Sequence, residues 1–462
     1  MKTKLHFSYF LLSILLLSVA IGTGANAQNY QWKSLSMGGA GFVSGIITSK
    51  QEQNLMYART DVGGAYKWNA ATGSWLPLTD WLAANQSGLY GVESLAIDPR
   101  APNKLYIYAG ISYFDDGKTA ILRSNDYGQT FTTIETTNQF KAHGNGAGRS
   151  NGERLQVDPN LGSTLFVGTR SNGLWKSTNS GDTWSRLDGL NITTTPNGNG
   201  VSFVMIDPTS GTAGNASQTI YVGVSRSDST GANFYKSTNG GVSFSVVTGG
   251  PTNFLPQRAV LNPNGDMIIN YANGSGPGGT TTEPMSTGGI WKYNTTSGAW
   301  TNITPSGISK AWGGLSVDPN NPNRMIASTT NNYQLQYGPT NGGAYGDRIF
   351  LTTNGGATWT DVVARGFTLN PNGANWITGQ AIHWAGSIEF DPFDTKKVYV
   401  TSGNGVFSND NIDVASTAWK FEVKGLEETV PTSIISLPGG PLYTTIGDYD
   451  GFKYTNINDY GT

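Results

Sequence analysis

The fold is decided by the stretch Ser124-Asn-Asp-Tyr-Gly-Gln-Thr-Phe131, which returns along the chain in close copies. Each copy has Ser or Thr, then Asp or Asn, then Gly, then Thr or Ser, and ends on an aromatic residue. Clear copies occupy residues 177–184, 237–244 and 352–359, and looser ones occupy 69–75, 294–300 and 416–419. The closing aromatics stand at 75, 131, 184, 244, 300, 359 and 419. Seven copies at a nearly constant period indicate a repeat architecture.

A second marker follows the same period and divides each repeat into strands. Asp-Pro or Asn-Pro ends a short apolar run and precedes another at residues 98, 158, 207, 262, 318 and 391. One further strand precedes each copy of the repeated stretch and one follows it, and the Pro and Gly residues supply the turns. Four short antiparallel strands per repeat are typical of a propeller blade. We therefore predict an all-β fold, a seven-bladed β-propeller. The repeated stretch resembles the Asp-box of sialidase-like and related propellers, and turn chemistry accounts for its residues.

Composition excludes several classes of function. The 462 residues carry a formal charge of −2, so there is no basic surplus for binding nucleic acid. The absence of Cys excludes disulfides, thiolate metal sites and a cysteine nucleophile, and three His leave little room for a metal site. We expect no cofactor and no metal. Gly is about one residue in seven, and only 13% of residues are charged, as in a chain of strands and tight turns.

The two ends of the chain differ from the repeats. Residues 1–27 combine Lys2 and Lys4, an apolar run and an Ala25-Asn-Ala27 site, the pattern of a cleaved signal peptide. We expect a secreted protein with no membrane partner. Residues 28–425 form the predicted propeller. Residues 426–462 are interpreted as a linker and the first, partial blade of a second propeller, which favours a chain that is a fragment of a longer protein. The alternative is a tail that closes the first ring.

Two aspartates occupy matching positions in the opening blade of each predicted propeller. Asp61 and Asp448 each follow an apolar strand and precede Gly and an aromatic-containing strand. Glycoside hydrolysis requires two carboxyl groups, one to protonate the leaving oxygen and one to activate water or attack the sugar. Two propellers facing each other would bring these aspartates together, although each alone is also an ordinary turn residue.

At these residues the chain resembles family 74 glycoside hydrolases, the xyloglucanases. The resemblance begins with the stretches Met37–Ile46 and Tyr57–Trp68, continues at 151–155, 168–177 and 314–324, and includes Gly447-Asp448 followed by Gly451-Phe452. It implies two tandem seven-bladed propellers around a cleft that holds xyloglucan, a plant cell-wall polysaccharide. It also implies hydrolysis of the β-1,4-glucan backbone with inversion, with Asp61 as general base and Asp448 as general acid.

Two departures from the family pattern stand out. Asp448 is followed by Tyr449-Asp450, where the family usually has an apolar and a small residue. Asp450 could compete for the acid role or raise the pKa of its neighbour by repulsion. The family is also far longer than this chain, so most of a second propeller is absent and the activity of the chain alone stays open.

Sugar subsites need flat aromatic faces with a polar group. Several aromatic residues lie in Gly- and Asn-rich connections rather than in the repeats, and core packing is the alternative for each. The predicted substrate-binding residues are Trp312, Trp376, Trp384, Tyr90 and Tyr113.

Other functions compete with hydrolysis. A non-catalytic glycan-binding propeller would use the same fold, with Asp61 as a turn residue only. A sialidase is disfavoured because no Arg-Ile-Pro segment precedes the boxes and no arginine triad is evident. The segment 360–388 is too short for the extra loop that blocks the cleft in chain-end-acting members, which favours internal cleavage. We expect the protein to act as a monomer.

Overall fold

The computed structural model describes residues 33–226, 231–277 and 283–462. The predicted signal peptide, residues 1–27, lies outside the described residues. Residues 36–462 form one unit, and Lys33 to Leu35 belong to a second unit with the residues before them. Within the described residues, no helix has both the length and the apolar character that a membrane span requires.

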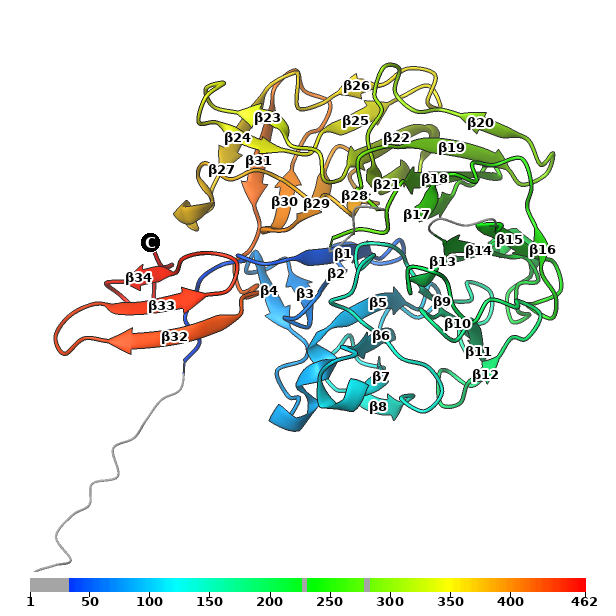
Figure 1. The fold of residues 1–462 in the computed structure, drawn as a ribbon, viewed down its shortest axis with the longest axis horizontal. Helices are drawn as coiled ribbons and strands as arrows, with labels where there is room; N and C mark the ends of the chain where they lie inside the picture. Colours follow the sequence, from blue (N-terminus) through cyan, green and yellow to red (C-terminus); the bar gives the residue numbers. More distant parts are fainter. Residues whose placement is uncertain (1–32, 227–230, 278–282) are drawn as a thin grey trace, which may run out of the picture. The chain divides into compact units, whose positions relative to one another are not determined.

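Four-stranded antiparallel sheets repeat along this unit in chain order (Figure 1). The first sheet contains β1 (Val43–Thr48), β2 (Met56–Thr60), β3 (Ala65–Asn69) and β4 (Ser74–Pro77). The second contains β5 (Val92–Ile97), β6 (Leu105–Gly110), β7 (Thr119–Ser124) and β8 (Thr132–Glu135). The third contains β9 (Leu155–Val157), β10 (Leu165–Gly168), β11 (Leu174–Ser177) and β12 (Ser185–Arg186). The fourth contains β13 (Gly200–Ile206), β14 (Ile220–Ser225), β15 (Phe234–Ser237) and β16 (Ser245–Val246).

The remaining sheets of the repeat add short elements to the same plan. The fifth contains β17 (Leu255–Leu261), β18 (Asp266–Ala272), β19 (Gly288–Asn294) and β20 (Trp300–Asn302). The sixth contains β21 (Trp312–Asp318), β22 (Asn321–Thr329), β25 (Ile349–Thr352) and β26 (Thr360–Asp361), with the hairpin β23 (Gln334–Tyr337) and β24 (Ala344–Gly346) inserted. The seventh contains β28 (Ile388–Phe390), β29 (Val398–Ser402), β30 (Gly405–Asn409) and β31 (Thr417–Phe421), and β27 (Phe367–Asn370) pairs with β31 in parallel. Four short 3₁₀ helices are also described: η1 (Ala84–Tyr90), η2 (Asp115–Gly117), η3 (Pro208–Ser210) and η4 (Asn375–Ile377).

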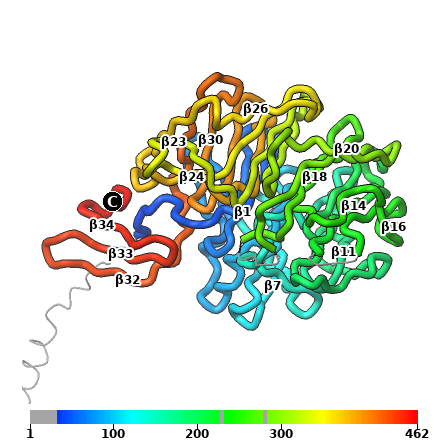
Figure 2. The backbone as a smooth tube through the Cα atoms, turned by 45° about the horizontal axis from the view of Figure 1, so that its top comes forward, coloured from blue at the N-terminus to red at the C-terminus, as the bar shows by residue number. Residues whose placement is uncertain are grey.

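The sheets form a closed ring, which confirms the predicted propeller of seven blades for the described residues. The first strands of successive blades contact one another, and β28 of the seventh blade contacts β1 of the first. Figure 2 shows the same ring in a tilted view. These inner strands are almost fully buried, and apolar clusters fill the spaces between neighbouring blades. The fold is therefore held by blade-to-blade packing around the ring.

The Asp-box turns have one geometry, which explains why the sequence repeats them. In the copy at 124–131, the backbone N–H of Thr130 donates to Asp126 Oδ1 at 2.9 Å, and that of Gly128 donates to Ser124 Oγ at 2.8 Å. The equivalent bonds in the three other clear copies measure 2.9–3.0 Å and 2.9–3.1 Å. Gly128 has a φ of 85°, a conformation that favours glycine. The prediction of turn chemistry for the boxes is confirmed.

Three of the box tryptophans connect their blade to the one before it. The indole N–H of Trp359 donates to Ile303 O at 2.7 Å, and that of Trp300 donates to Thr248 O at 2.9 Å. The indole N–H of Trp75 in the first blade donates to Glu422 O beyond β31 of the seventh, at 2.7 Å. The same kind of contact therefore joins the fourth blade to the fifth and the fifth to the sixth, and it also joins the seventh blade to the first, where the ring closes.

The last strands form a separate sheet beside the ring, next to the segments that lead into β1 and leave β31 (Figures 1 and 2). This sheet contains β32 (Pro431–Ser436), β33 (Leu442–Ile446) and β34 (Phe452–Tyr454), within the segment interpreted from the sequence as a linker and a partial blade. Its end packs on the start of the unit, since Gly461 N–H donates to Ser36 O at 3.3 Å. Every residue of β32 is exposed.

Residues 426–428, expected to belong to a linker, are packed into the ring. Leu426 is fully buried and belongs to the apolar cluster shared by the first and seventh blades. Gly39 N–H donates to Leu426 O at 2.8 Å, and Glu427 Oε2 accepts from the backbone N–H of Met37 at 2.9 Å. The segment after β31 therefore runs beside residues 37–39 and is held to them by hydrogen bonds.

Candidate active site

Asp61 lies in the turn between β2 and β3, at the end of the ring opposite the Asp-boxes. Its side chain is buried, and Oδ2 lies 2.9 Å from Nε of Arg149, which comes from the connection between β8 and β9. The Arg149 guanidinium also lies 4.7 Å from the ring centre of Phe42. Arg149 is therefore held on one side by an aromatic face and on the other by the carboxylate.

Glu428 is the second carboxyl group at this position. Glu428 is 1% exposed, Oε1 accepts a hydrogen bond from the backbone N–H of Val62 at 3.1 Å, and the carboxyl lies beside that of Asp61. Burial raises the pKa of the Glu428 carboxyl well above its usual range, and the charge of Asp61 adds to the rise. Asp61 thus faces one cation and one buried acid.

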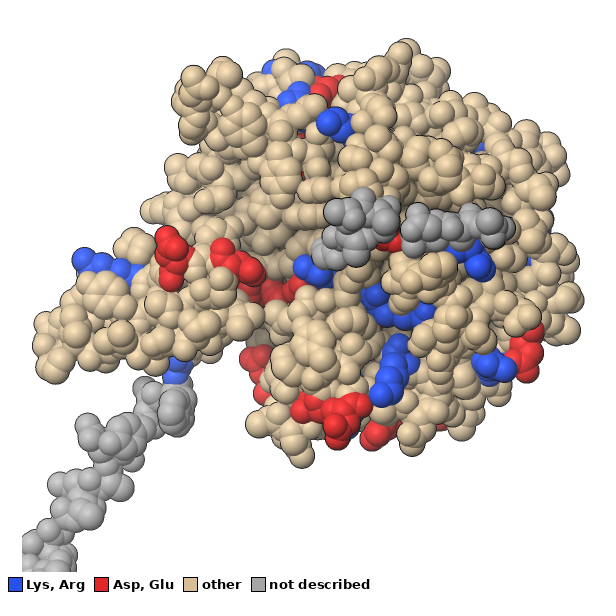
Figure 3. All heavy atoms as spheres, in the orientation of Figure 1, with Lys and Arg blue, Asp and Glu red and all other residues tan. Residues whose placement is uncertain are grey.

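Several causes act on the pKa of Asp61. Burial raises the pKa, and the charge of Asp448 raises it further, while Arg149 and the hydrogen bond with Glu428 oppose the rise. Asp448 lies in the turn between β33 and β34 and is exposed. Its charge reaches Asp61 across the boundary between the ring and the last sheet. Figure 3 shows acidic side chains gathered where that sheet adjoins the ring, with basic side chains beside them.

The residues around Asp448 also contact the ring. The hydroxyl of Tyr449 donates to Asn404 Oδ1, and its ring centre lies 5.1 Å from that of Trp376. Asp450 is exposed. The turn that carries Asp448 is therefore attached to loops of the seventh blade.

The cationic residues nearest to Asp61 in the sequence, Arg59 and Lys67, do not form an ion pair with it. Arg59 points into the ring, where it binds Glu153 at 3.0 Å, and Lys67 lies over the ring of Tyr127 at 4.9 Å. Residues i and i+2 of a strand share a face, whereas Asp61 stands beyond the last residue of β2 in the turn. The cation that does bind it, Arg149, is 88 residues away in sequence.

Trp312 does not fit the predicted role in substrate binding. Its side chain is fully buried in β21, 5.3 Å from the ring centre of Phe350. Since a sugar cannot reach an indole inside the core, that prediction is wrong, and Trp312 packs between the fifth and sixth blades.

The four other predicted aromatics lie on connections at the same end of the ring as Asp61. Tyr90 ends η1 and is half-buried, and its carbonyl accepts from Gly64 N–H, in the Asp61 turn, at 2.8 Å. Tyr113 is 58% exposed, and its hydroxyl accepts from Asn145 Nδ2 at 2.7 Å. Trp376 in η4 is half-buried and donates to Met37 O at 3.0 Å. Trp384 is half-buried, with a φ of 54°.

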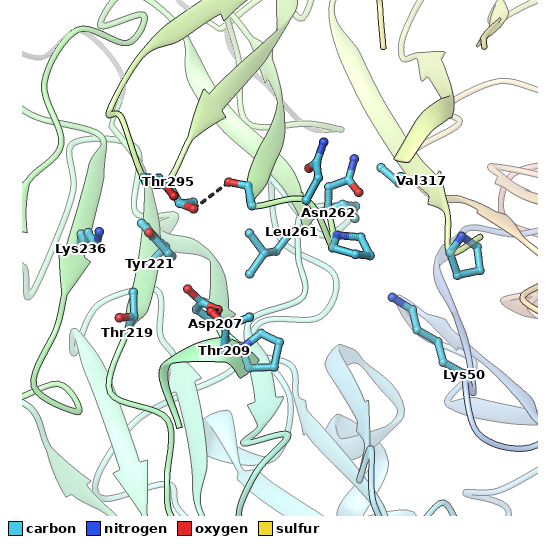
Figure 4. A pocket seen from close by; sticks show the side chains of 17 residues that line it. Lys50, Asp207, Thr209, Thr219, Tyr221, Lys236, Leu261, Asn262, Thr295 and Val317 are labelled. Atoms are coloured by element: carbon cyan, nitrogen blue, oxygen red, sulfur yellow. Dashed lines mark hydrogen bonds between the residues drawn. The ribbon is translucent and has the colours of Figure 1, made fainter. Parts of the chain in front are cut away.

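A large hollow lies at the other end of the strands (Figure 4). It has a volume of about 660 Å³ and is lined by turns that carry Asp207, Asn262 and Thr295, with Lys50 at its rim. Thr295 Oγ1 donates to Gly265 O at 2.7 Å beside it. None of the predicted site residues lines this hollow, so it is distinct from the Asp61 site.

Arg149 and Glu428 are the residues that sequence reasoning missed. Arg149 follows the Gly-rich stretch 144–148, and Glu428 ends an adjacent pair of acidic residues in a chain with few charges. Both patterns are weak signals, because Gly-rich loops and surface carboxylates are common. Arg149 and Glu428 are recognised as site residues only in the structure, where they lie beside Asp61.

Comparison with known proteins identifies relatives over nearly the whole chain. A xyloglucanase of Paenibacillus sp is 36% identical and matches 94% of this chain and 45% of its own length. An oligoxyloglucan-reducing end-specific xyloglucanase of Emericella nidulans is 30% identical and matches 93% and 59%. The crystal structure of the Niastella koreensis GH74 enzyme superposes with a TM-score of 0.86 at 50% identity, over 92% of this chain and 60% of that one. No protein-family model matches. The chain spans about half the length of the curated relatives it matches.

Proposed function

The chain belongs to glycoside hydrolase family 74, and on that premise we propose that it forms part of a secreted enzyme that hydrolyses the β-1,4-glucan backbone of xyloglucan. The observation that carries the proposal is the buried Asp61 carboxyl, paired with Arg149 and reached by the charge of Asp448. In this proposal Asp61 is the general base and Asp448 the general acid of an inverting reaction.

The environment of Asp61 supports its role. A general base must be ionised at the working pH, and Arg149 stabilises the ionised form although burial opposes it. In an inverting reaction the base removes a proton from water while the acid protonates the leaving oxygen, and the two carboxyls stand about 6.5–9.5 Å apart. Asp448 is exposed on its turn. We infer that a second propeller would cover Asp448 and hold it protonated, with β32–β34 as the start of its first blade.

Internal cleavage is the proposed mode of action. The connection from β26 to β28 contributes β27 to the seventh blade and anchors Trp376 by its indole N–H, so little of it remains to project over the site. A relative is named as reducing end-specific, which makes the mode a matter for experiment. Endo-type action would lower the viscosity of xyloglucan before much reducing sugar appears, whereas chain-end action would release short oligosaccharides first.

The test is hydrolysis of tamarind xyloglucan by residues 28–462, beside Asp61→Asn. We expect oligosaccharide release that falls at least about 100-fold in the variant, as for loss of a general base. A matched control is Asp410→Asn, whose side chain is 80% exposed and pairs only with Lys397 among the described ion pairs. Loss of activity in both variants, or in neither, would contradict the role of Asp61.

A glycan-binding module is the second candidate. It is favoured by the match to only about half of each relative and by the exposure of Asp448. It predicts that folded protein is retarded in a xyloglucan gel without hydrolysing the polymer. In that case activity should return when the chain is extended by a second propeller. Size-exclusion chromatography of the same sample would test the expected monomer.

A further inference from the structure

Glu428 occupies a place in the ring that is built around it. The residue lies between β31 and β32, outside both strands. A Cβ atom at Gly63 would overlap Glu428 Oε2, and one at Gly41 would overlap the carbonyl oxygen of Glu428. Any side chain at these two positions would therefore collide with Glu428. Two glycines near the start of the ring, Gly41 and Gly63, leave space for a residue that follows the seventh blade.

One oxygen of Glu428 requires a proton. Oε1 accepts from Val62 N–H, whereas Oε2 is buried without a described hydrogen bond. The side chain of Thr60 lies beside this carboxyl, but its hydroxyl donates to Gly64 O at 2.9 Å. The group that the Glu428 carboxyl meets is the carboxyl of Asp61, which in its ionised form can only accept. Two carboxyls can share a hydrogen bond only when one of them is protonated. The geometry thus calls for a single proton between Asp61 and Glu428.

The surrounding charges decide which carboxyl holds that proton. Arg149 binds Asp61 Oδ2 at 2.9 Å and so favours negative charge on Asp61. Glu428 has no cation within ion-pair distance among the described residues, and burial raises its pKa well above the usual range. The charge of Asp448 also acts on Asp61, whereas Arg170 acts on Arg149 rather than on either carboxyl. The phenol of Tyr66 lies on the Glu428 side and donates to the carbonyl of Glu427.

We propose that Glu428 is a positioning residue that stays protonated at neutral pH and donates a hydrogen bond to the ionised carboxylate of Asp61. Asp61 is then fixed between two donors, Arg149 and Glu428, with its remaining lone pairs directed away from both. The consequence for catalysis rests on the proposed role of Asp61 as general base. The protonation of Glu428 itself is independent of that role and can be measured in the chain without substrate.

The direct test is infrared difference spectroscopy of the carbonyl stretch of protonated carboxyl groups. The wild-type spectrum minus that of Glu428→Gln should contain such a band at pH 7, and Gln can keep both hydrogen bonds because it has an acceptor and a donor. In Asp61→Asn the band should titrate at lower pH, because the adjacent negative charge is gone. Absence of the band from the difference at pH 7 would overturn the proposal.

A matched control is Glu427→Gln, the neighbouring glutamate. Its carboxyl accepts from the backbone N–H groups of Met37 and Gly38 rather than bonding to Asp61. Glu427→Gln should remove a separate band whose titration midpoint does not respond to Asp61→Asn. A response equal to that of Glu428 would show that the change spreads through the fold, and the proposed pairing would fail.

Kinetics separate this proposal from the proposed function. If the chain hydrolyses xyloglucan, the acid limb of the pH profile of kcat/KM reports the pKa of Asp61. Glu428→Gln should leave this limb in place. Glu428→Leu removes a charge-assisted hydrogen bond to Asp61 and should move the limb to higher pH by about 1 to 2 units. A limb unmoved in Glu428→Leu would refute the positioning role. The infrared band without any hydrolysis would refute the proposed activity of this chain and leave the protonated pair in place.

Discussion

Trp75 joins the first blade to the seventh, so its replacement tests how the ring is closed. The residue lies in β4 and is 1% exposed. Its indole N–H donates to Glu422 O at 2.7 Å, its backbone N–H donates to Lys424 O at 2.7 Å, and its ring meets that of Trp68 edge-on at 5.2 Å. The substitution Trp75→Phe keeps the backbone bond and an aromatic ring. It removes the indole N–H and leaves the Glu422 carbonyl without that donor.

The expected loss of stability follows from two contributions. A buried carbonyl left without a donor costs about 1–3 kcal/mol, and the space left by the smaller ring costs about 1 kcal/mol more. With a total near 3 kcal/mol and a denaturation slope of about 3 kcal/mol per molar urea, the midpoint should fall by about 1 M. Circular dichroism during urea unfolding measures this shift.

The control for Trp75 is an exposed tryptophan with a local hydrogen bond. Trp81 is 48% exposed, and its indole N–H donates to Leu78 O at 2.9 Å. Trp81→Phe should change stability by no more than about 0.5 kcal/mol. If Trp75→Phe unfolds within about 0.2 M of the wild-type midpoint, the bond to Glu422 does not hold the first and seventh blades together.

Three further predictions concern the boxes, the closing segment and the substrate surface. Asp126→Ala removes the acceptor of Thr130 N–H and Oγ, at 2.9 and 2.5 Å, and should cost about 1 kcal/mol in thermal unfolding; an unchanged Tm would contradict this. Burial raises the pKa of Glu427 to about 7, so the folded state holds a proton that the unfolded chain releases, and stability should fall as pH rises from about 4.5 to about 7. Glu427→Gln should flatten that fall in urea midpoints, and equal slopes for both proteins would refute the assignment. Tyr113→Ala should weaken retardation in a xyloglucan gel several-fold, whereas Phe393→Ala, 45% exposed at the other end of the strands, should not; equal effects would exclude a specific surface.

The fold was predictable because its signal is local and repeated. The box around Asp126 uses its own side chains to satisfy its own turn, so the hydrogen bonds that define it are visible in eight consecutive residues. Seven such turns, with Asp-Pro turns between them, leave a propeller as the consistent architecture. The position of Asp61 after an apolar strand was predictable for the same reason.

The surroundings of Asp61 were not predictable, because they depend on contacts between distant residues. Arg149 and Glu428 stand in segments whose local patterns indicate only a loop and a linker, and ring closure brings both to Asp61. Trp312 shows the opposite error, a local pattern that predicted a loop where the structure has a buried strand. Its Gly-rich neighbours suggested a loop, yet Gly313 and Gly314 lie within β21, where their lack of side chains allows the backbone of the next blade to approach. Composition alone does not distinguish these two uses of glycine.

The return of residues 426–428 to the opening blade has a consequence for how the protein can be divided. A version that ends at Gly425 would retain every strand of the seven blades and would look complete by secondary structure. It would lose Leu426 from the closing cluster and Glu428 from beside Asp61. A piece that keeps every strand of the seven blades and a piece that also keeps Glu428 beside Asp61 therefore differ by a few residues. Chimaeras that graft a different C-terminal segment onto the ring should place their junction after Glu428, so that the contacts of residues 426–428 with the opening blade are kept.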